Sequence, residues 1–324
     1  MILRDLPDAR LARVPENTAF RAGFYARWGR ENAVVLGTTT RAEFEPWTQT
    51  LSIKRAWGGE ESYLLEGRRL AVDEARTLVL NEGARYGARI ASLRPVTSLA
   101  VFFRPGMADE VAAAALEGWP RALAHGPGVG RRATGFAEHL RPSDDRVGAR
   151  LLAIRDAVRG GEDDEDWLEE QCHELLGAML AAELGWRARA GRLAELSRSS
   201  RDELLARVDR ATDCLLTRHA ERVTLDELAA SAALSKFHLL RAFRAVHGVT
   251  PMSMLAAVRT RAAVRLLEDE SQSLEEVAQA SGFGSRQTLF RHLRRHCGAG
   301  GQALRRVSAT CRVGSGRRRG SARR

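Results

Sequence analysis

Long apolar runs are absent from this chain of 324 residues. A membrane-spanning helix needs about 20 consecutive apolar residues, and the first residues, MILRDLPDAR, also lack the apolar core of a signal peptide. We therefore expect a cytoplasmic protein without a membrane partner. Cysteine is scarce as well. The four cysteines form no CxxC pair, so they are expected to be reduced thiols and not a disulfide framework.

Lysine is almost absent, because arginine supplies every basic side chain except Lys54 and Lys236. The net charge of +10 lies entirely beyond residue 200: residues 201–311 carry 17 basic and 12 acidic side chains, and residues 312–324 carry 6 basic and none acidic. A basic C-terminal third after a near-neutral remainder is expected when one domain contacts nucleic-acid phosphates. The length allows two domains, each with its own core.

Two stretches near the C-terminus, residues 225–251 and 274–301, repeat one pattern of acidic, apolar and basic residues. The offset between matching residues is 49 in the first part and 50 in the second, so one residue, assigned to Gly284, has been added to the second copy. Thr224 and Ser273 are placed to cap a first helix, and Glu227 and Glu276 complete capping boxes. The pattern predicts a helix-turn-helix unit in each copy.

The second helix of each unit begins after Ser235 or Ser285 and has one apolar face. The opposite face carries Phe237, Leu240, Arg241 and Arg244 in the first copy, and Arg286, Gln287, Phe290, Arg291 and Arg294 in the second. Arginine and glutamine pair with guanine and adenine edges, and exposed apolar groups suit thymine methyls. For a single helix, simple solvation of these side chains would be the better interpretation. Duplication of the whole unit favours DNA binding instead.

A long helix is predicted between the two units, starting at Pro251 and carrying an apolar stripe. Such a connector fixes the distance between the two recognition helices. Helices that enter successive major grooves on one face of DNA stand about 34 Å apart, which is about one helical turn.

At this point residues 204–306 resemble the AraC/XylS family of bacterial transcription regulators. The motifs that carry the resemblance are A-x-x-x-x-L-S at 229–235, R-x-F-R at 241–244, G-V-T-P at 248–251, R-x-x-x-A at 259–263 followed by two leucines at 266–267, and A-x-x-x-G-F at 278–283. The chain departs from the family where a proline usually closes the second unit, since residues 298–301 read GAGG. Glycines are more flexible than proline, so the second unit is expected to be less stable than the first.

The resemblance implies roles for residues on both recognition helices. Base contacts fall on Phe237, Leu240 and Arg241 in the first unit, and on Arg286, Gln287, Thr288 and Arg291 in the second. Phosphate contacts are assigned to Lys236, Arg244, Arg294 and Arg295. The tail from residue 307, rich in Gly, Ser and Arg, is expected to be disordered and could add phosphate contacts.

The N-terminal part carries short β-type runs between residues 33 and 104, separated by turn residues about every ten positions. This spacing predicts an antiparallel sandwich or small barrel, and the pattern resembles the cupin-like sensor domain that precedes the DNA-binding half in many family members. A metal-dependent cupin enzyme would need histidines here, but the first is His125. We therefore expect no enzyme activity, no metal and no cofactor. A metal-free pocket lined by aromatic residues such as Tyr63 and Tyr86, with Arg55, Arg85 and Arg89 available for an anion, stays open beside the alternative that these aromatics form the core.

Helical periodicity covers residues 144–159 and 167–184. The second segment has an apolar stripe, namely Leu168, Cys172, Leu175, Leu176 and Met179, which could form a dimer seam or cover the sheet of its own subunit. A further helix over 202–218 is predicted to be capped by Ser200, with Glu203 completing the box.

These observations predict an α+β protein of several parts: a cupin-like β-rich sensor domain (1–142), a helical connector and possible dimerisation region (143–198), an all-α domain with two helix-turn-helix units (199–306) and a basic tail (307–324). The predicted function is sequence-specific transcription regulation controlled by an unidentified small-molecule effector. The expected partners are double-stranded promoter DNA, RNA polymerase and a second copy of the chain. The alternatives are a nonspecific or architectural DNA-binding protein and, less favoured, a metal-free cupin enzyme fused to a DNA-binding domain.

Overall fold

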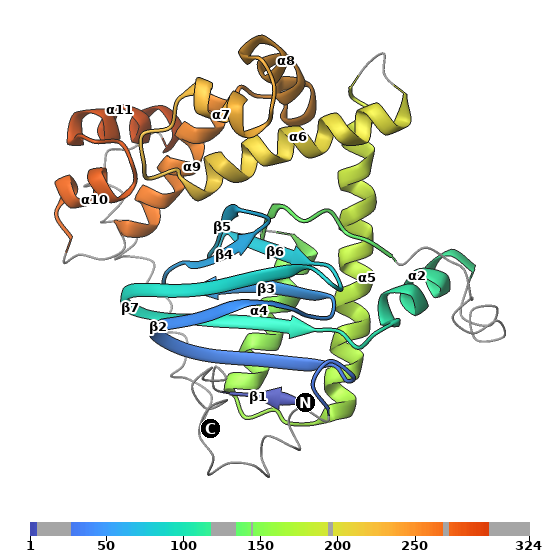
Figure 1. The fold of residues 1–324 in the computed structure, drawn as a ribbon. Coiled ribbons are helices and arrows are strands. Elements are labelled where there is room, and N and C mark those ends of the chain that lie inside the picture. Colours follow the sequence, from blue (N-terminus) through green and yellow to red (C-terminus); the bar gives the residue numbers. More distant parts are fainter. Residues whose placement is uncertain (5–26, 118–133, 144, 194–196, 268–271, 298–324) are drawn as a thin grey trace, which may run out of the picture. The chain divides into compact units, whose positions relative to one another are not determined.

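The computed structural model describes residues 1–4, 27–117, 134–143, 145–193, 197–267 and 272–297 (Figure 1). Two compact units emerge, Met1–Asp209 and Arg210–Arg324. The predictions made for the glycines at 298–301 and for the basic tail lie outside the described residues. None of the helices within the described ranges is long and apolar enough to cross a bilayer.

The first unit contains one mixed sheet, whose strands run in the order β1-β2-β7-β3-β6-β8. In addition, β4 pairs with β7, and β5 pairs with β4. The strands are β1 (Ile2–Leu3), β2 (Ala33–Thr48), β3 (Ser52–Trp57), β4 (Glu61–Leu65), β5 (Arg68–Val72), β6 (Arg76–Leu80), β7 (Arg85–Phe102) and β8 (Leu140–Pro142). All pairings are antiparallel except β1 with β2. The prediction of a β-rich N-terminal domain is confirmed, whereas a purely antiparallel arrangement was wrong for β1.

Two of the short β-type runs in the sequence, which cover residues 88–93 and 97–102, belong to the single strand β7. The ladder between β7 and β2 is interrupted between the pairs Arg41–Ala91 and Thr39–Val96, and Pro95 lies in that interruption. Proline has no N–H to donate, so it is tolerated where the ladder is broken. Because both β2 and β7 pass through the irregularity, β7 pairs with β3 in one half and with β4 in the other.

Two helices cover one face of this sheet, α4 (Arg146–Arg159) and α5 (Glu165–Ala190), capped by Asp145 and Asp164 (Figure 1). The apolar stripe of α5 is buried in one core with Ile53 of β3, Leu99 of β7 and Leu151 of α4. Of the two alternatives for this stripe, covering its own sheet is therefore the one observed, and the stripe is not available as a dimer seam. Helix α2 (Met107–Glu117), which also borders this core, was not predicted.

The remaining helices are α6 (Arg198–Thr217), α7 (Leu225–Ser231), α8 (Lys236–His247), α9 (Pro251–Leu266), α10 (Leu274–Ala280) and α11 (Arg286–Cys297). Helix α6 passes from the first unit into the second. It starts earlier than predicted, because the hydroxyl of Ser197 accepts a hydrogen bond from the Ser200 N–H (3.2 Å). Ser200 is therefore inside the helix and is not its cap. Both predicted helix-turn-helix pairs and the long connector α9 are confirmed.

Candidate nucleic-acid interface

The first helix of each unit is held by the predicted capping box. Thr224 and Ser273 accept hydrogen bonds from the backbone of Glu227 and Glu276, and both glutamate side chains bond back to the cap residue. The hydrogen bonds from Thr224, assisted by Arg218, lower the pKa of Glu227 to about 2. These reciprocal bonds satisfy N–H groups that would otherwise lack partners at the helix start, so sequence chemistry alone fixes where α7 and α10 begin.

The two turns follow the same path with different residues. Linker 281–285 is one residue longer than linker 232–235, as the change of offset predicts. Gly282 and Gly284 have φ of 80° and 70°, and Ala233 has φ of 51° in the first turn. The left-handed region is strained for alanine and free for glycine. The first turn therefore holds strain that the second avoids.

Gly282 also brings the turn before α11 against the segment between α6 and α7. A Cβ at this position would lie 2.5 Å from the carbonyl oxygen of His219 and 2.9 Å from the Cα of Ala220. Beside it, the guanidinium of Arg259 on α9 donates to the carbonyl oxygens of His219 (2.7 Å) and Glu221 (2.6 Å). Arg259 and Gly282 belong to the family motifs, and this contact gives both a structural role. They fix the second helix-turn-helix pair to the segment between α6 and α7.

Helix α8 buries Leu239 and Phe243 and turns the predicted base-reading residues outward. Phe237 is 76% exposed, Arg241 is exposed and Leu240 is half-buried. Lys236, predicted to contact phosphate, forms an ion pair with Asp226 of α7 (2.9 Å). This pair was not predicted, although the acidic first turn of α7 and the lysine at the start of α8 are both present in the sequence.

Helix α11 presents the larger polar surface. Leu289 and Leu293 join the core formed with α9 and α10, and Arg286, Gln287, Arg291, Arg294 and Arg295 are exposed. The guanidinium of Arg286 lies over the Phe290 ring, 5.3 Å from its centroid. Thr288 is half-buried, and its hydroxyl accepts a hydrogen bond from Ser285 (3.0 Å), so it takes part in the helix cap.

Charge on these two faces is of one sign. Neither α8 nor α11 contains an acidic residue. The exposed guanidinium groups of Arg241, Arg244, Arg291, Arg294 and Arg295 form no ion pair within the part of the chain that the structure describes. In contrast, arginines away from these faces, such as Arg104 and Arg218, are paired with glutamates. Unpaired guanidinium groups on an exposed helix face are suited to donate hydrogen bonds to the phosphate oxygens and to the acceptor atoms of base edges in DNA.

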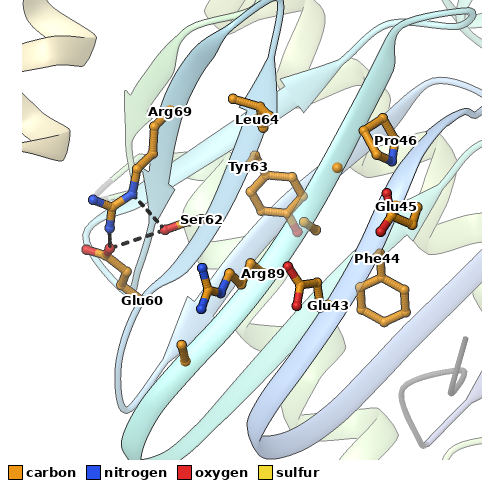
Figure 2. Close-up of a pocket in the computed structure, with 13 residues that line it drawn as sticks. Glu43, Phe44, Glu45, Pro46, Glu60, Ser62, Tyr63, Leu64, Arg69 and Arg89 are labelled. Carbon is orange, nitrogen blue, oxygen red and sulfur yellow. Dashed lines mark hydrogen bonds and ion pairs between the residues drawn. The ribbon is translucent and has the colours of Figure 1, made fainter.

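A separate pocket of about 780 Å³ lies on the β domain where β2, β4, β5 and β7 meet (Figure 2). Its charged lining consists of Glu43, Glu45, Glu60, Arg69 and Arg89, and its apolar lining includes Phe44, Pro46, Tyr63, Leu64 and Ala88. Arg69 donates to Glu60 (2.5 Å). Of the residues suggested from sequence, Tyr63 and Arg89 line this pocket. Arg55 does not, since it donates to the carbonyl oxygens of Gly148 (2.5 Å) and Glu74 (2.8 Å) and so holds the sheet to α4.

Residues 228–306 match a family model described as a helix-turn-helix domain. The HTH-type transcriptional regulator YbfI of Bacillus subtilis is 38% identical over 65 residues, covering 20% of this chain and 23% of that protein. The MmsAB operon regulatory protein of Pseudomonas aeruginosa is 37% identical over 62 residues, covering 19% and 20%. The chain thus matches about a fifth of the length of these relatives.

Among solved structures, the DNA-binding domain of AdpA in complex with a target DNA is 32% identical and covers 33% of this chain and 96% of its own, with a TM-score of 0.32. ToxT from Vibrio cholerae is 9% identical and covers 85% and 97%, with a TM-score of 0.31.

The helices from α7 to α11 therefore make up a DNA-binding domain of the helix-turn-helix class, with two units. This domain is that of the AraC/XylS family of transcription regulators, and the chain carries it behind a β-rich N-terminal domain.

Proposed function

We propose that the whole chain is a sequence-specific transcription regulator that acts in the cytoplasm. In this proposal α8 and α11 enter successive major grooves. Phe237, Leu240 and Arg241, and Arg286, Gln287, Thr288 and Arg291, contact bases, and Lys236, Arg244, Arg294 and Arg295 contact phosphates. The observation that carries the proposal is that both second helices expose arginines without ion-pair partners among the described residues, on faces that contain no acid.

We also propose that the β domain is a cupin-like sensor for a small effector, and that the chain is divided by role into sensing (1–142), connecting (143–198) and DNA-binding (199–306) parts. The pocket of Figure 2 supports an effector site, because it is concave and combines apolar with charged lining. A homodimer and a contact with RNA polymerase complete the proposal. The dimer must use a surface other than the stripe of α5, which is buried in its own subunit.

The test starts by selecting binding sites for the full chain from a random DNA library, since no target is needed in advance. Affinity for the selected site is then compared with affinity for a scrambled site, in the wild type and in Arg241→Ala and Arg291→Ala. Loss of one bidentate base contact costs about 1–3 kcal/mol on the correct site and relaxes the base preference at one position. Arg261→Ala is the matched control, because Arg261 is an exposed arginine on α9, outside both recognition helices.

A nonspecific DNA-binding protein is the competing function. It would give no enriched motif, and both arginine variants would lose the same factor on selected and scrambled DNA. The salt dependence adds a second readout, because loss of a phosphate contact reduces its slope by about one, whereas loss of a base contact leaves most of the slope in place. Equal losses on both DNAs would overturn the regulator proposal.

A further inference from the structure

Lys54 is buried inside the β domain without a polar partner. It lies on β3 between Ile53 and Arg55, whose side chains face the helices, so Lys54 points to the other face of the sheet. The residue is 2% exposed. Its Nζ lies 3.6 Å from the centroid of the Phe102 ring and 5.4 Å from that of Tyr86. Among the described residues it has no hydrogen bond and no ion pair.

Another polar group, the Ser52 hydroxyl, is buried on the same face. The hydroxyl of Ser52, two residues before Lys54, is buried and makes no hydrogen bond of acceptable geometry, although the Tyr86 hydroxyl lies beside it. Buried polar groups without partners are rare, since each costs on the order of 1–3 kcal/mol. The Ser52 hydroxyl and the Lys54 amine therefore place two polar groups on one buried strand face that is otherwise lined by aromatic rings.

A buried acid lies near the amine. The Glu61 carboxylate accepts a hydrogen bond from the Ser98 hydroxyl (2.6 Å), and the Tyr63 hydroxyl is within hydrogen-bonding reach of it. Burial raises the pKa of Glu61, and burial lowers the pKa of Lys54 to about 7, with Glu61 opposing part of that change. Near neutral pH a large fraction of Lys54 is thus an uncharged amine, and the rise in the pKa of Glu61 reflects the same desolvation.

This combination differs from an ordinary ion pair. An ammonium retained for structure would be matched by close acceptors, and methionine or leucine would fill the same space without the cost of burying an amine. A desolvated, uncharged lysine is a nucleophile toward carbonyl carbon. Aromatic side chains surround this amine, so the surroundings suit a small apolar molecule.

We infer that Lys54 is a carbonyl-binding residue, and that the β domain takes up a small aldehyde or ketone as an imine on its Nζ. The Nζ lone pair attacks the carbonyl carbon, and the amine loses its two protons. The carbonyl oxygen leaves as water after receiving two protons, one of them supplied by Glu61, which is then reprotonated by the amine. Amine plus carbonyl compound therefore gives imine plus water, with no oxidant or reductant. A role for this imine in regulation rests on the proposed function, but the chemistry does not.

Two features connect the cluster to the surface. From Phe102 the aromatic wall continues to Trp28 (ring centroids 4.8 Å apart) and on to Trp47 (6.4 Å), whose side chain is 38% exposed. On the other side, Tyr63 is both near Glu61 and part of the lining of the pocket in Figure 2.

The chain offers an unusually direct test, because Lys54 and Lys236 are its only lysines and Lys236 is exposed and paired with Asp226. The full chain is treated with propanal and sodium cyanoborohydride at pH 7, and the rate of propylation at each lysine is followed by peptide mass spectrometry. We expect Lys54 to react at least about tenfold faster than Lys236, because more of it is uncharged at this pH. In urea, where burial is lost, that preference should disappear.

A native rate at Lys54 equal to or below the rate at Lys236 would overturn the inference, since Lys54 would then be an inert core residue. This comparison is made in the wild type, so it does not depend on any variant that folds poorly. Binding of the untreated full chain to the selected DNA site is measured separately, because propylation also reaches Lys236, a proposed phosphate contact. Absence of DNA specificity in the untreated chain would refute the regulator proposal and leave the lysine result standing, so the two failures can be told apart.

Discussion

Replacing Lys54 by methionine should stabilise the protein at neutral pH and change how stability depends on pH. The unfolded chain carries Lys54 with its ordinary pKa of 10.5, whereas burial lowers the pKa to about 7 in the folded state. Between these values the unfolded chain binds one more proton than the folded chain. The unfolded state is therefore favoured at the lower pH, and stability rises as the pH increases through this window.

The magnitude follows from the two pKa values. One proton of difference corresponds to a slope of about 1.4 kcal/mol per pH unit. Allowing for partial titration at both ends, the wild type should gain roughly 2–3 kcal/mol relative to Lys54→Met between pH 7.5 and 9.5. Methionine has similar volume, adapts to irregular spaces and contacts aromatic rings favourably, so the core should accept it.

The assay is urea denaturation of the full chain at several pH values in this window, followed by tryptophan fluorescence. Lys236→Met is the matched control and should run parallel to the wild type, since the Lys236 side chain is 57% exposed. Parallel curves for the wild type and Lys54→Met would refute the reasoning, because they would mean that Lys54 keeps its proton when the chain folds.

Three further changes test local features of the fold. Ala233→Gly should stabilise the chain by about 0.5–1 kcal/mol because it removes left-handed backbone strain. Gly282→Ala should destabilise it by about 2 kcal/mol or more because the new Cβ would meet backbone atoms. Thermal unfolding of both variants checks this contrast, and similar effects at the two sites would contradict it. Glu227→Gln should lower the melting temperature at pH 7, and its difference from the wild type should shrink as the pH falls from 4.5 toward the folded pKa of about 2. Burial raises the pKa of Asp209 to about 6, although the hydrogen bond from Trp186 acts in the opposite direction, so ionisation at higher pH opposes folding. Asp209→Asn should therefore increase the free energy of unfolding by about 3 kcal/mol above pH 6 and leave it unchanged below pH 3.8. Urea titrations measure this, and an equal gain at every pH would argue against the ionisation.

The C-terminal domain could be predicted from sequence because its signals are local. A capping box such as Thr224 with Glu227 needs only residues three apart, and the buried Leu239 and Phe243 are set by helical spacing. The extra residue in the second turn was visible as a change of offset between the copies. Each of these features depends on neighbours within one or two turns of chain.

The β domain was harder to predict because its decisive contacts join distant residues. In the sequence, Pro95 predicts the end of a strand. The structure shows a gap in the pairing with β2, more than fifty residues earlier in the chain, and this gap allows one strand to contain the proline. From its sequence, the apolar stripe of α5 fits a dimer seam as well as a cover for its own sheet. Only its burial in one core with Ile53 and Leu99 distinguishes the two. Lys54 gave no signal at all, because a lysine within a strand is ordinarily a solvated residue and its burial depends on strands β4 and β7.

The contact of Gly282 and Arg259 with the segment between α6 and α7 has a consequence for the DNA that this domain accepts. Since the turn before α11 is fixed to the segment that leads into the first helix-turn-helix pair, the two recognition helices are held in one rotational setting. DNA rotates by about 34–36° with each base pair, so an insertion of about five base pairs between half-sites moves the second one to the opposite side of the duplex. The domain therefore selects the helical phase of its site as well as the bases, and spacing changes should reduce binding even where both half-sites are intact.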